Sequence, residues 1–306
     1  MSALHVYYGP DALTAPAVVR RIGVGDAFAA LREGFDDFRA MPSHLAFLAV
    51  FYVGAGIVLT SLSSFGGALQ LVYPLAAGFA LVGPFFAIGL YELSRRRELG
   101  LEVSYTDAFI VANSPALPSI VCLGLGLVAI FAAWTAIAEE LYVWLYGPAA
   151  PTSAIAFLQD VFSTSRGWLL IGVGGGVGFL FALATLCLTI VSFPLMLDRD
   201  VGLIPAIEAS LRLCRTSPLA VATWGAIVAG LLILGSIPLF IGLAVVMPVL
   251  GHGTWRFYRR AVERDPAHEH PATWPKAVQK PASYHATPHS LIFPLPQRQE
   301  DTERSS

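Results

Sequence analysis

The sequence predicts an all-α membrane protein with six transmembrane helices, arranged as three helical hairpins that are each preceded by an amphipathic interfacial helix. Of the 306 residues, 56% are hydrophobic and only 13% are charged, and mean hydropathy is +0.66. Soluble domains typically carry roughly 25% charged residues. The apolar residues also gather in long blocks, and a proline recurs near the end of several of them. These observations place most of the chain in hydrocarbon.

Five apolar blocks carry the prediction: Leu45–Leu62, Leu71–Leu93, Leu117–Tyr146, Trp168–Leu197 and Leu219–Leu250. A helix needs about 20 apolar residues to cross a bilayer core of about 30 Å. The last block is too long for one crossing, because a single helix over it would measure about 48 Å. A turn at 235–238 would divide it into helices at 217–235 and 239–260. We expect this hairpin, with one long helix as the alternative.

The three recurring prolines suggest one unit used three times. Pro84, Pro194 and Pro248 each stand near the end of an apolar run and just before a polar or arginine-bearing exit. The predicted repeat units cover 24–97, 104–200 and 203–262. Each would consist of an interfacial helix, a proline stop, a spanning helix, a turn, and a second spanning helix with an internal proline.

The segment 26–39 is the clearest interfacial helix. Its apolar residues recur at the spacing of one helical face, and they are Phe28, Leu31, Phe35 and Phe38. Charged residues occupy the rest of the helix, so we expect it to lie flat at the membrane surface. The alternative is an ordinary amphipathic helix docked on the bundle. Segments 205–217 and, in shorter form, 106–110 repeat this pattern.

The chain ends differ from its middle. Residues 1–23 are predicted to be a flexible arm, 24–262 the transmembrane domain, and 263–306 a disordered tail rich in proline and histidine. Arginines gather on one side of the predicted spans, whereas the opposite loops near 65–70, 147–167 and 235–238 contain only Arg166. The positive-inside rule therefore predicts that both termini are cytoplasmic.

Several functional classes are not supported by the sequence. A net charge of -2 without a basic patch gives no sign of nucleic-acid binding. The three cysteines are scattered and predict neither a disulfide framework nor a metal site. The glycine-rich run 172–178 lies inside a predicted span and favours close helix packing over nucleotide binding. No catalytic motif, cofactor or metal set is recognised, so we expect that the chain is not an enzyme.

One group of polar residues is a candidate site, because polar groups near membrane depth require a partner or a role. If the three units pack around a common axis, these residues converge at the cytoplasmic face. They are Glu92, Arg95, Asp198, Arg199, His252 and Arg256. The favoured interpretation is a structural clamp made of ion pairs, and the other is a ligand or ion site.

Three segments resemble a known family: 74–96 around Pro84, 192–200 around Pro194, and 248–259 around Pro248. Together they resemble the uncharacterised bacterial integral-membrane family known as domain of unknown function 2189 (DUF2189), over about 25–262. The resemblance implies a bacterial cell inner-membrane protein and supplies no activity or ligand. Some members of the family are labelled as similar to cytochrome c oxidase subunit I. This chain lacks the membrane histidines that haem and copper require.

The functional expectation is accordingly a non-enzymatic polytopic inner-membrane protein with a scaffold, assembly or envelope-homeostasis role. The alternative is a transporter or channel for a small solute, ion or lipid, because spanning helices broken by proline are typical of such proteins. Expected partners are the lipid bilayer and either another membrane protein or a second copy of the chain.

Overall fold

The computed structural model describes residues 6–7, 17–41, 81–149, 153–237 and 241–271. All regular elements within these ranges are helical, and an isolated β-bridge joins Val19 to Val262. The predicted span at 45–62, the first part of the span at 71–93, and residues 272–306 of the predicted tail lie outside the described residues. The predicted all-helical fold class is confirmed for the part of the chain described.

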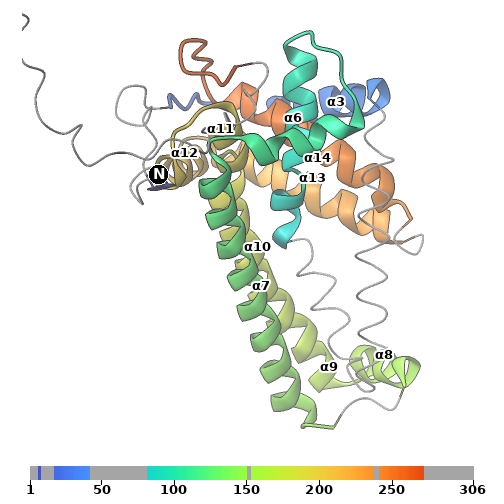
Figure 1. Ribbon diagram of the computed structural model, residues 1–306. Coiled ribbons are helices and arrows are strands. Elements are labelled where there is room, and N and C mark those ends of the chain that lie inside the picture. The colour runs from blue at the N-terminus through green and yellow to red at the C-terminus, as the bar shows by residue number, and fades with distance from the viewer. Residues whose placement is uncertain (1–5, 8–16, 42–80, 150–152, 238–240, 272–306) are drawn as a thin grey trace, which may run out of the picture. The chain divides into compact units, whose positions relative to one another are not determined.

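Twelve named helical elements follow one another (Figure 1). They are α3 (Val24–Ala40), α6 (Ile88–Glu98), the 3₁₀ helix η2 (Tyr105–Asn113), α7 (Leu117–Tyr146), α8 (Ala154–Ser163), α9 (Ser165–Leu169), the π-helical turn η3 (Leu170–Gly174), α10 (Gly175–Thr189), α11 (Ser192–Asp198), α12 (Leu203–Thr216), α13 (Pro218–Ser236) and α14 (Leu243–Ala261). A further helical stretch, 81–86, precedes α6.

Three helical segments are long and apolar enough to cross a membrane: Leu117–Tyr146, Ser165–Asp198 and Pro218–Ser236. Their outward side chains are apolar, as at Leu125, Phe179 and Leu234, which are all more than 60% exposed. Because large exposed apolar surfaces are costly in water, these faces fit a lipid environment. The prediction of membrane-spanning helices is therefore supported at three of the six places.

The glycine-rich run brings two of these segments together. α7 and α10 lie side by side (Figure 1). A Cβ at Gly178 would lie 3.0 Å from the Trp134 ring, and one at Gly174 would lie 3.4 Å from Leu141, both on α7. Gly172, Gly175 and Gly176 have no such neighbour. Two of the glycines thus pack closely against a helix, as expected from the sequence.

The sixth predicted span, 239–260, differs from these three. Its helix, α14, carries Arg256, Arg259 and Arg260 in its last turns and is not among the candidate spans. Two separate helices, α13 and α14, occupy this part of the chain, and Gly235 and Gly242 meet where it turns. A Cβ at Gly242 would lie 2.8 Å from the Gly235 Cα atom, so only a residue without a side chain fits.

Two of the recurring prolines accompany a helix break. The stretch containing Pro84 ends in a turn at Ala87 before α6 begins, and a turn at 190–191 separates α10 from α11. Pro194 lies in the first turn of α11, where the missing N–H requires no partner. Pro248 differs, because it lies inside α14.

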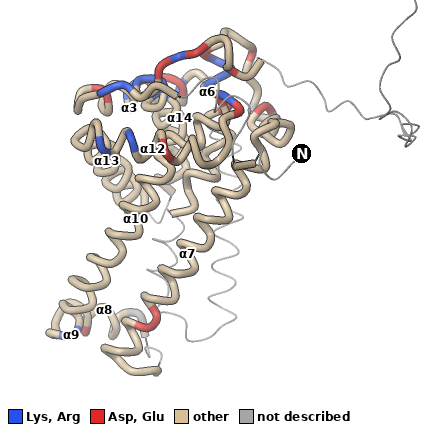
Figure 2. The backbone as a smooth tube through the Cα atoms, turned by 90° about the vertical axis from the view of Figure 1, so that its left-hand side faces the viewer, with Lys and Arg blue, Asp and Glu red and all other residues tan. Residues whose placement is uncertain are grey.

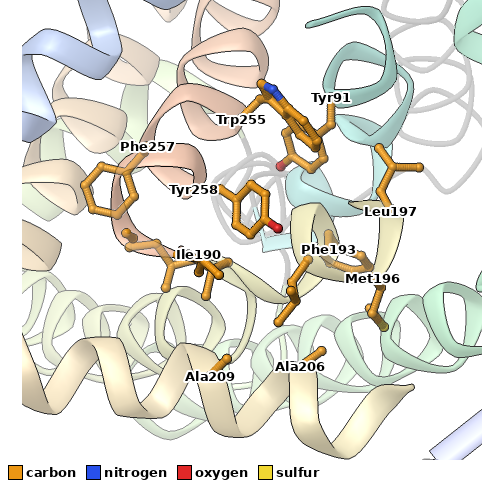
Figure 3. Packing of buried hydrophobic residues seen from close by; sticks show 14 of the residues in the cluster. Tyr91, Ile190, Phe193, Met196, Leu197, Ala206, Ala209, Trp255, Phe257 and Tyr258 are labelled. Atoms are coloured by element: carbon orange, nitrogen blue, oxygen red, sulfur yellow. The ribbon is translucent and has the colours of Figure 1, made fainter. Parts of the chain in front are cut away.

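The buried core lies at the charged end of the described helices. Figure 3 shows Trp255 and Tyr258 of α14 on the side of Tyr91 and Phe193, from α6 and α11, while Phe257 points to the other side of α14. The Trp224 and Phe257 rings stack at 5.2 Å between centroids. Helices α6, α11 and α14 are thereby fixed relative to one another, and all six candidate site residues belong to them or directly follow α11.

Helix α3 packs on α14 through a face that the sequence analysis did not select. Its buried residues are Ala27, Ala30, Gly34 and Asp37. Phe28 and Phe35 of the predicted apolar face are 56% and 44% exposed. A Cβ at Gly34 would lie 2.9 Å from the Val249 carbonyl oxygen, with the Gly253 backbone closer still. The small residues bring the two backbones into contact and leave the aromatic face outward.

The described parts of the predicted arm and tail make specific contacts with the rest of the chain. Residues 17–23 and 263–271 have specific partners, whereas the predictions assigned them to a flexible arm and a disordered tail. Arg20 N–H donates to the Ala261 carbonyl at 2.8 Å, and Glu263 N–H donates to the Val18 carbonyl at 2.9 Å. We call residues 263–271 the strap. The tail was predicted to be disordered because it is rich in proline and has no apolar period, and the partners of the strap, which are arginines and backbone carbonyls elsewhere in the chain, leave no such pattern.

Candidate functional site

The six predicted site residues belong to α6, α11 and α14 or directly follow α11, and charged residues gather around α6 and α14 (Figure 2). Five are at most 2% exposed, and Arg256 is partly buried. The structure does not join them into one constellation. It places them in three groups, each completed by residues that the sequence analysis did not name.

The first group surrounds Asp37 of α3. Its carboxylate accepts hydrogen bonds from Arg256 Nε and Nη2, both at 2.8 Å, and from Ser94 Oγ at 2.8 Å. Arg97 donates to the same carboxylate. Because an unpaired buried carboxylate is costly, two guanidinium groups and a hydroxyl offset its desolvation. This group fastens α3 to α6 and α14.

His252 belongs to the same group through Ser94. The His252 Nδ1 atom lies 2.8 Å from Ser94 Oγ. A hydrogen-bonded serine and histidine form the nucleophile and base of many hydrolases. Here Ser94 donates its proton to Asp37, so Ser94 Oγ is the acceptor for a proton on His252 Nδ1. His252 is then a donor to the serine and not its base, and both side chains are fully buried.

The second group is the pair Glu92 and Arg95, one turn apart on α6. Arg95 Nε donates to Glu92 Oε2 at 2.7 Å, and Arg95 Nη2 donates to Glu92 Oε1 at 3.2 Å. Both side chains are buried. Arg95 also reaches the strap, donating to the carbonyls of His270 at 3.2 Å and Pro271 at 3.3 Å.

The third group surrounds Asp198 at the end of α11. Arg259 donates to both carboxylate oxygens at 2.9 Å, and the Tyr258 hydroxyl donates at 2.6 Å. Arg259 Nε additionally donates to Glu98 Oε2 at 3.0 Å. Arg199 is nearby, with its Nε 3.7 Å from Asp198 Oδ2, and it donates to the Glu263 carbonyl of the strap. Helices α6, α11 and α14 are joined by these contacts.

Comparison with known proteins agrees with this membrane architecture. Residues 72–198 match the model of the family DUF2189, described as a predicted integral membrane protein. The resemblance predicted from the sequence is thereby confirmed over that segment. No curated protein and no solved structure matches the chain.

The DUF2189 match takes in α6 to α11 and so includes Glu92, Arg95 and Asp198. It excludes α14, which supplies His252 and Arg256, and also α3, which supplies Asp37. The polar groups therefore join the segment that matches the family to helices outside it.

The residues that complete the three groups were not predicted from the sequence; they are Asp37, Ser94, Arg97, Glu98, Tyr258, Arg259 and His270. One signal was present for Asp37, because it continues the small-residue face of Ala27, Ala30 and Gly34 at helical spacing. A carboxylate on a face of small residues indicates burial against another helix. No comparable pattern marks His270.

The arrangement can hold helices together. Its carboxylates have guanidinium partners from the same chain, and within the described ranges no cluster of three or more metal-ligating side chains is found. The ion pairs join α6, α11 and α14 to one another and to α3.

Proposed function

We propose that this chain is a polytopic bacterial inner-membrane protein without enzymatic activity, which acts as a scaffold, as an assembly factor or in envelope homeostasis. The internal pairing of its buried charges carries the proposal. Asp37, Glu92 and Asp198 are each held by arginines of neighbouring turns or helices. A site for a charged solute would need groups that exchange these partners for the solute, at the cost of unpairing buried charges.

The proposed membrane architecture keeps six spans in three hairpins, with both termini in the cytoplasm. Two features support it. Charged residues are concentrated around α3, α6 and α14, while few lie near α8 and α9 (Figure 2). The exposed Phe28 and Phe35 on α3 are suited to a membrane interface, and Arg39 lies over the Phe35 ring, 5.8 Å from its centroid. The lipid bilayer is thus the first partner.

Crosslinking in cells tests the scaffold role. A photoreactive residue at Phe35, on the exposed face of α3, should recover one constant protein partner or a second copy of the chain. Proteoliposomes that contain the purified protein should pass none of a panel of small ions and solutes. Reproducible flux that Asp198→Asn abolishes in a folded protein would contradict the proposal.

The alternative function, a transporter or channel for a small solute, ion or lipid, is favoured by one observation. The candidate span Ser165–Asp198 is not a continuous α-helix, because it contains the π-helical turn η3 and the break at 190–191. Such irregular backbone within a span occurs where neighbours or a cavity satisfy its polar groups. The same flux measurement distinguishes the two functions.

A further inference from the structure

The strap is held by three arginines that come from the core of the charged end. Arg95 of α6 donates to the carbonyls of His270 and Pro271, and Arg199, just after α11, donates to the carbonyl of Glu263. Arg259 of α14 donates to the Glu269 carboxylate at 3.3 Å. We call Arg95, Arg199 and Arg259 the arginine face.

At the end of α11 the roles are reversed, because there the strap donates hydrogen bonds and α11 accepts them. His270 N–H donates to the Asp198 carbonyl at 2.6 Å, and His270 Nδ1 lies 2.7 Å from the Leu197 carbonyl, to which it donates. The strap is therefore bound as a peptide is bound, through backbone carbonyls, a backbone N–H, one carboxylate and one imidazole.

All three arginines keep a carboxylate partner that does not belong to the strap, since Arg199 Nε lies 3.7 Å from Asp198 Oδ2. Arg95 is held by Glu92, and Arg259 is held by Asp198 and Glu98. Departure of the strap would leave these guanidinium groups in position with donors to spare. The arginine face is thus built by the helices and does not depend on the strap for its form.

The strap itself has little apolar anchoring. Its middle residues Pro266 and Ala267 are exposed, and of its nine residues only His270 is buried. Hydrogen bonds to charged groups carry its attachment. Carbonyl and carboxylate groups of another chain could accept these hydrogen bonds in place of the strap.

We propose that the arginine face is a peptide-binding surface which the strap occupies in cis, and that an acidic peptide of a partner protein, turned as the strap is turned at residues 266–269, occupies it when the strap is released. The partner segment must offer backbone carbonyls to Arg95 and Arg199 and a carboxylate to Arg259. This inference rests on the proposed scaffold function and names the chemistry of its partner.

Peptide binding to the full-length protein in detergent tests the proposal. The probe is a fluorescent peptide with the sequence of residues 262–271. The double variant Glu269→Ala/His270→Ala removes the two side chains that anchor the strap, the partly buried Glu269 and the buried His270. Its matched control is His268→Ala, because the His268 side chain pairs with Asp265 inside the strap at 2.9 Å.

The double variant should bind the peptide at least about tenfold more tightly than the wild type or His268→Ala, because competition by the strap is weakened. A peptide with glutamine in place of Glu269 should bind less tightly. Equal binding by all three proteins, or no binding by a double variant that unfolds at the wild-type temperature, would overturn the proposal.

Hydrogen exchange of the wild-type protein gives a second readout that needs no variant. Excess peptide should speed exchange of the His270 amide and leave the amides of α14 unchanged. Exchange of the strap only together with α14 would overturn the proposal. So would displacement of the strap by phosphatidylglycerol vesicles but not by peptide, since the face would then be a lipid-headgroup site.

A negative result in these measurements would contradict the peptide-binding proposal without contradicting the scaffold role. Crosslinking from Phe35 could still recover a constant partner, which would then contact a different surface.

Discussion

Asp37 shows how a single carboxylate joins three helices. It is 1% exposed and receives hydrogen bonds from Ser94 and Arg97 of α6 and from Arg256 of α14. Removing its charge would leave two guanidinium groups facing a neutral amide, and one of its acceptor atoms would become a donor. The loss therefore exceeds the value of any one contact.

We expect Asp37→Asn to lower the free energy of unfolding by about 3 kcal/mol or more. The exposed neighbour Asp36 provides the matched control, and Asp36→Asn should change it by less than about 0.5 kcal/mol. Denaturation of both variants in the same detergent is the measurement. Equal free energies of unfolding for the two variants would show that the Asp37 contacts do not stabilise the packing of α3 on α6 and α14.

For single residues, the sequence predicted which charged residues form the candidate site but not which of them pair with each other. Glu92 and Arg95 are three residues apart, so their pairing was visible in the sequence. Asp37 and Arg256 are 219 residues apart, and only the packing of α3 on α14 brings them together. Asp37 was therefore assigned to the exposed polar face of its helix.

Among the elements, the crossing of α3 and α14 depends on glycine. We expect Gly34→Ala to cost about 1–3 kcal/mol, because the new methyl group meets the backbone of α14 and no flexible side chain can yield. Gly25→Ala on the same helix is the control, since a Cβ there meets nothing within 4 Å. Thermal unfolding of both variants is the measurement. A Gly34→Ala protein with the unfolding midpoint of the wild type would contradict the close packing of α3 on α14.

The attachment of the strap should depend on pH. Burial lowers the pKa of His270 below its ordinary value of 6.5; the Leu197 carbonyl and the charges of Asp200 and Asp198 oppose this, and Arg95 adds to it. The hydrogen bonds from Arg264, within the strap, lower the pKa of Glu269; burial opposes this, and the charges of Arg259 and Arg199, which lie outside the strap, lower it further. The docked strap thus favours neutral His270 and ionised Glu269. Its attachment is complete above about pH 6.5 and weakens as pH falls.

A nitroxide spin label measures this change. Attached at Ala267→Cys in a background without other cysteines, it should become more mobile as the pH falls below about 6.5. The His270→Ala variant should lose the part of the transition nearest pH 6.5. Label mobility that stays constant, or that rises with pH, would contradict the assignment.

The sequence predicted where helices lie along the chain better than which face of each helix is buried. Helix α3 was expected at 26–39 and is found at Val24–Ala40. Its aromatic stripe was visible, but a membrane protein can turn an apolar face toward lipid as well as toward its core. Periodicity alone does not distinguish these two directions, so the buried small-residue face was missed.

For the whole molecule, the proposed orientation makes a labelling prediction. A cysteine at Ser153, in the segment between α7 and α8, should react with a membrane-impermeant maleimide in intact cells that lack an outer membrane. A cysteine at Arg215, on α12, should react only after lysis, because arginine-rich ends remain in the cytoplasm. Labelling of both in intact cells, or the reverse pattern, would contradict the proposed topology.

Long apolar runs predicted α7, the segment 165–198 and α13 as spans, because length and composition suffice for that inference. They did not predict where the core lies. The buried core gathers at the charged end, where α14 packs against α3, α6 and α13. That arrangement depends on long-range contacts that no local pattern encodes.

The clamp itself is tested most directly by thermal unfolding of Asp198→Asn in detergent, measured beside the wild type with a solute-flux assay on the same preparations. Loss of the bidentate contact with Arg259 should lower the unfolding midpoint by roughly 5 °C or more, and neither protein should pass solute. A variant that unfolds like the wild type but loses a flux or ligand-binding activity that the wild type possesses would contradict the clamp and make Asp198 part of a functional site.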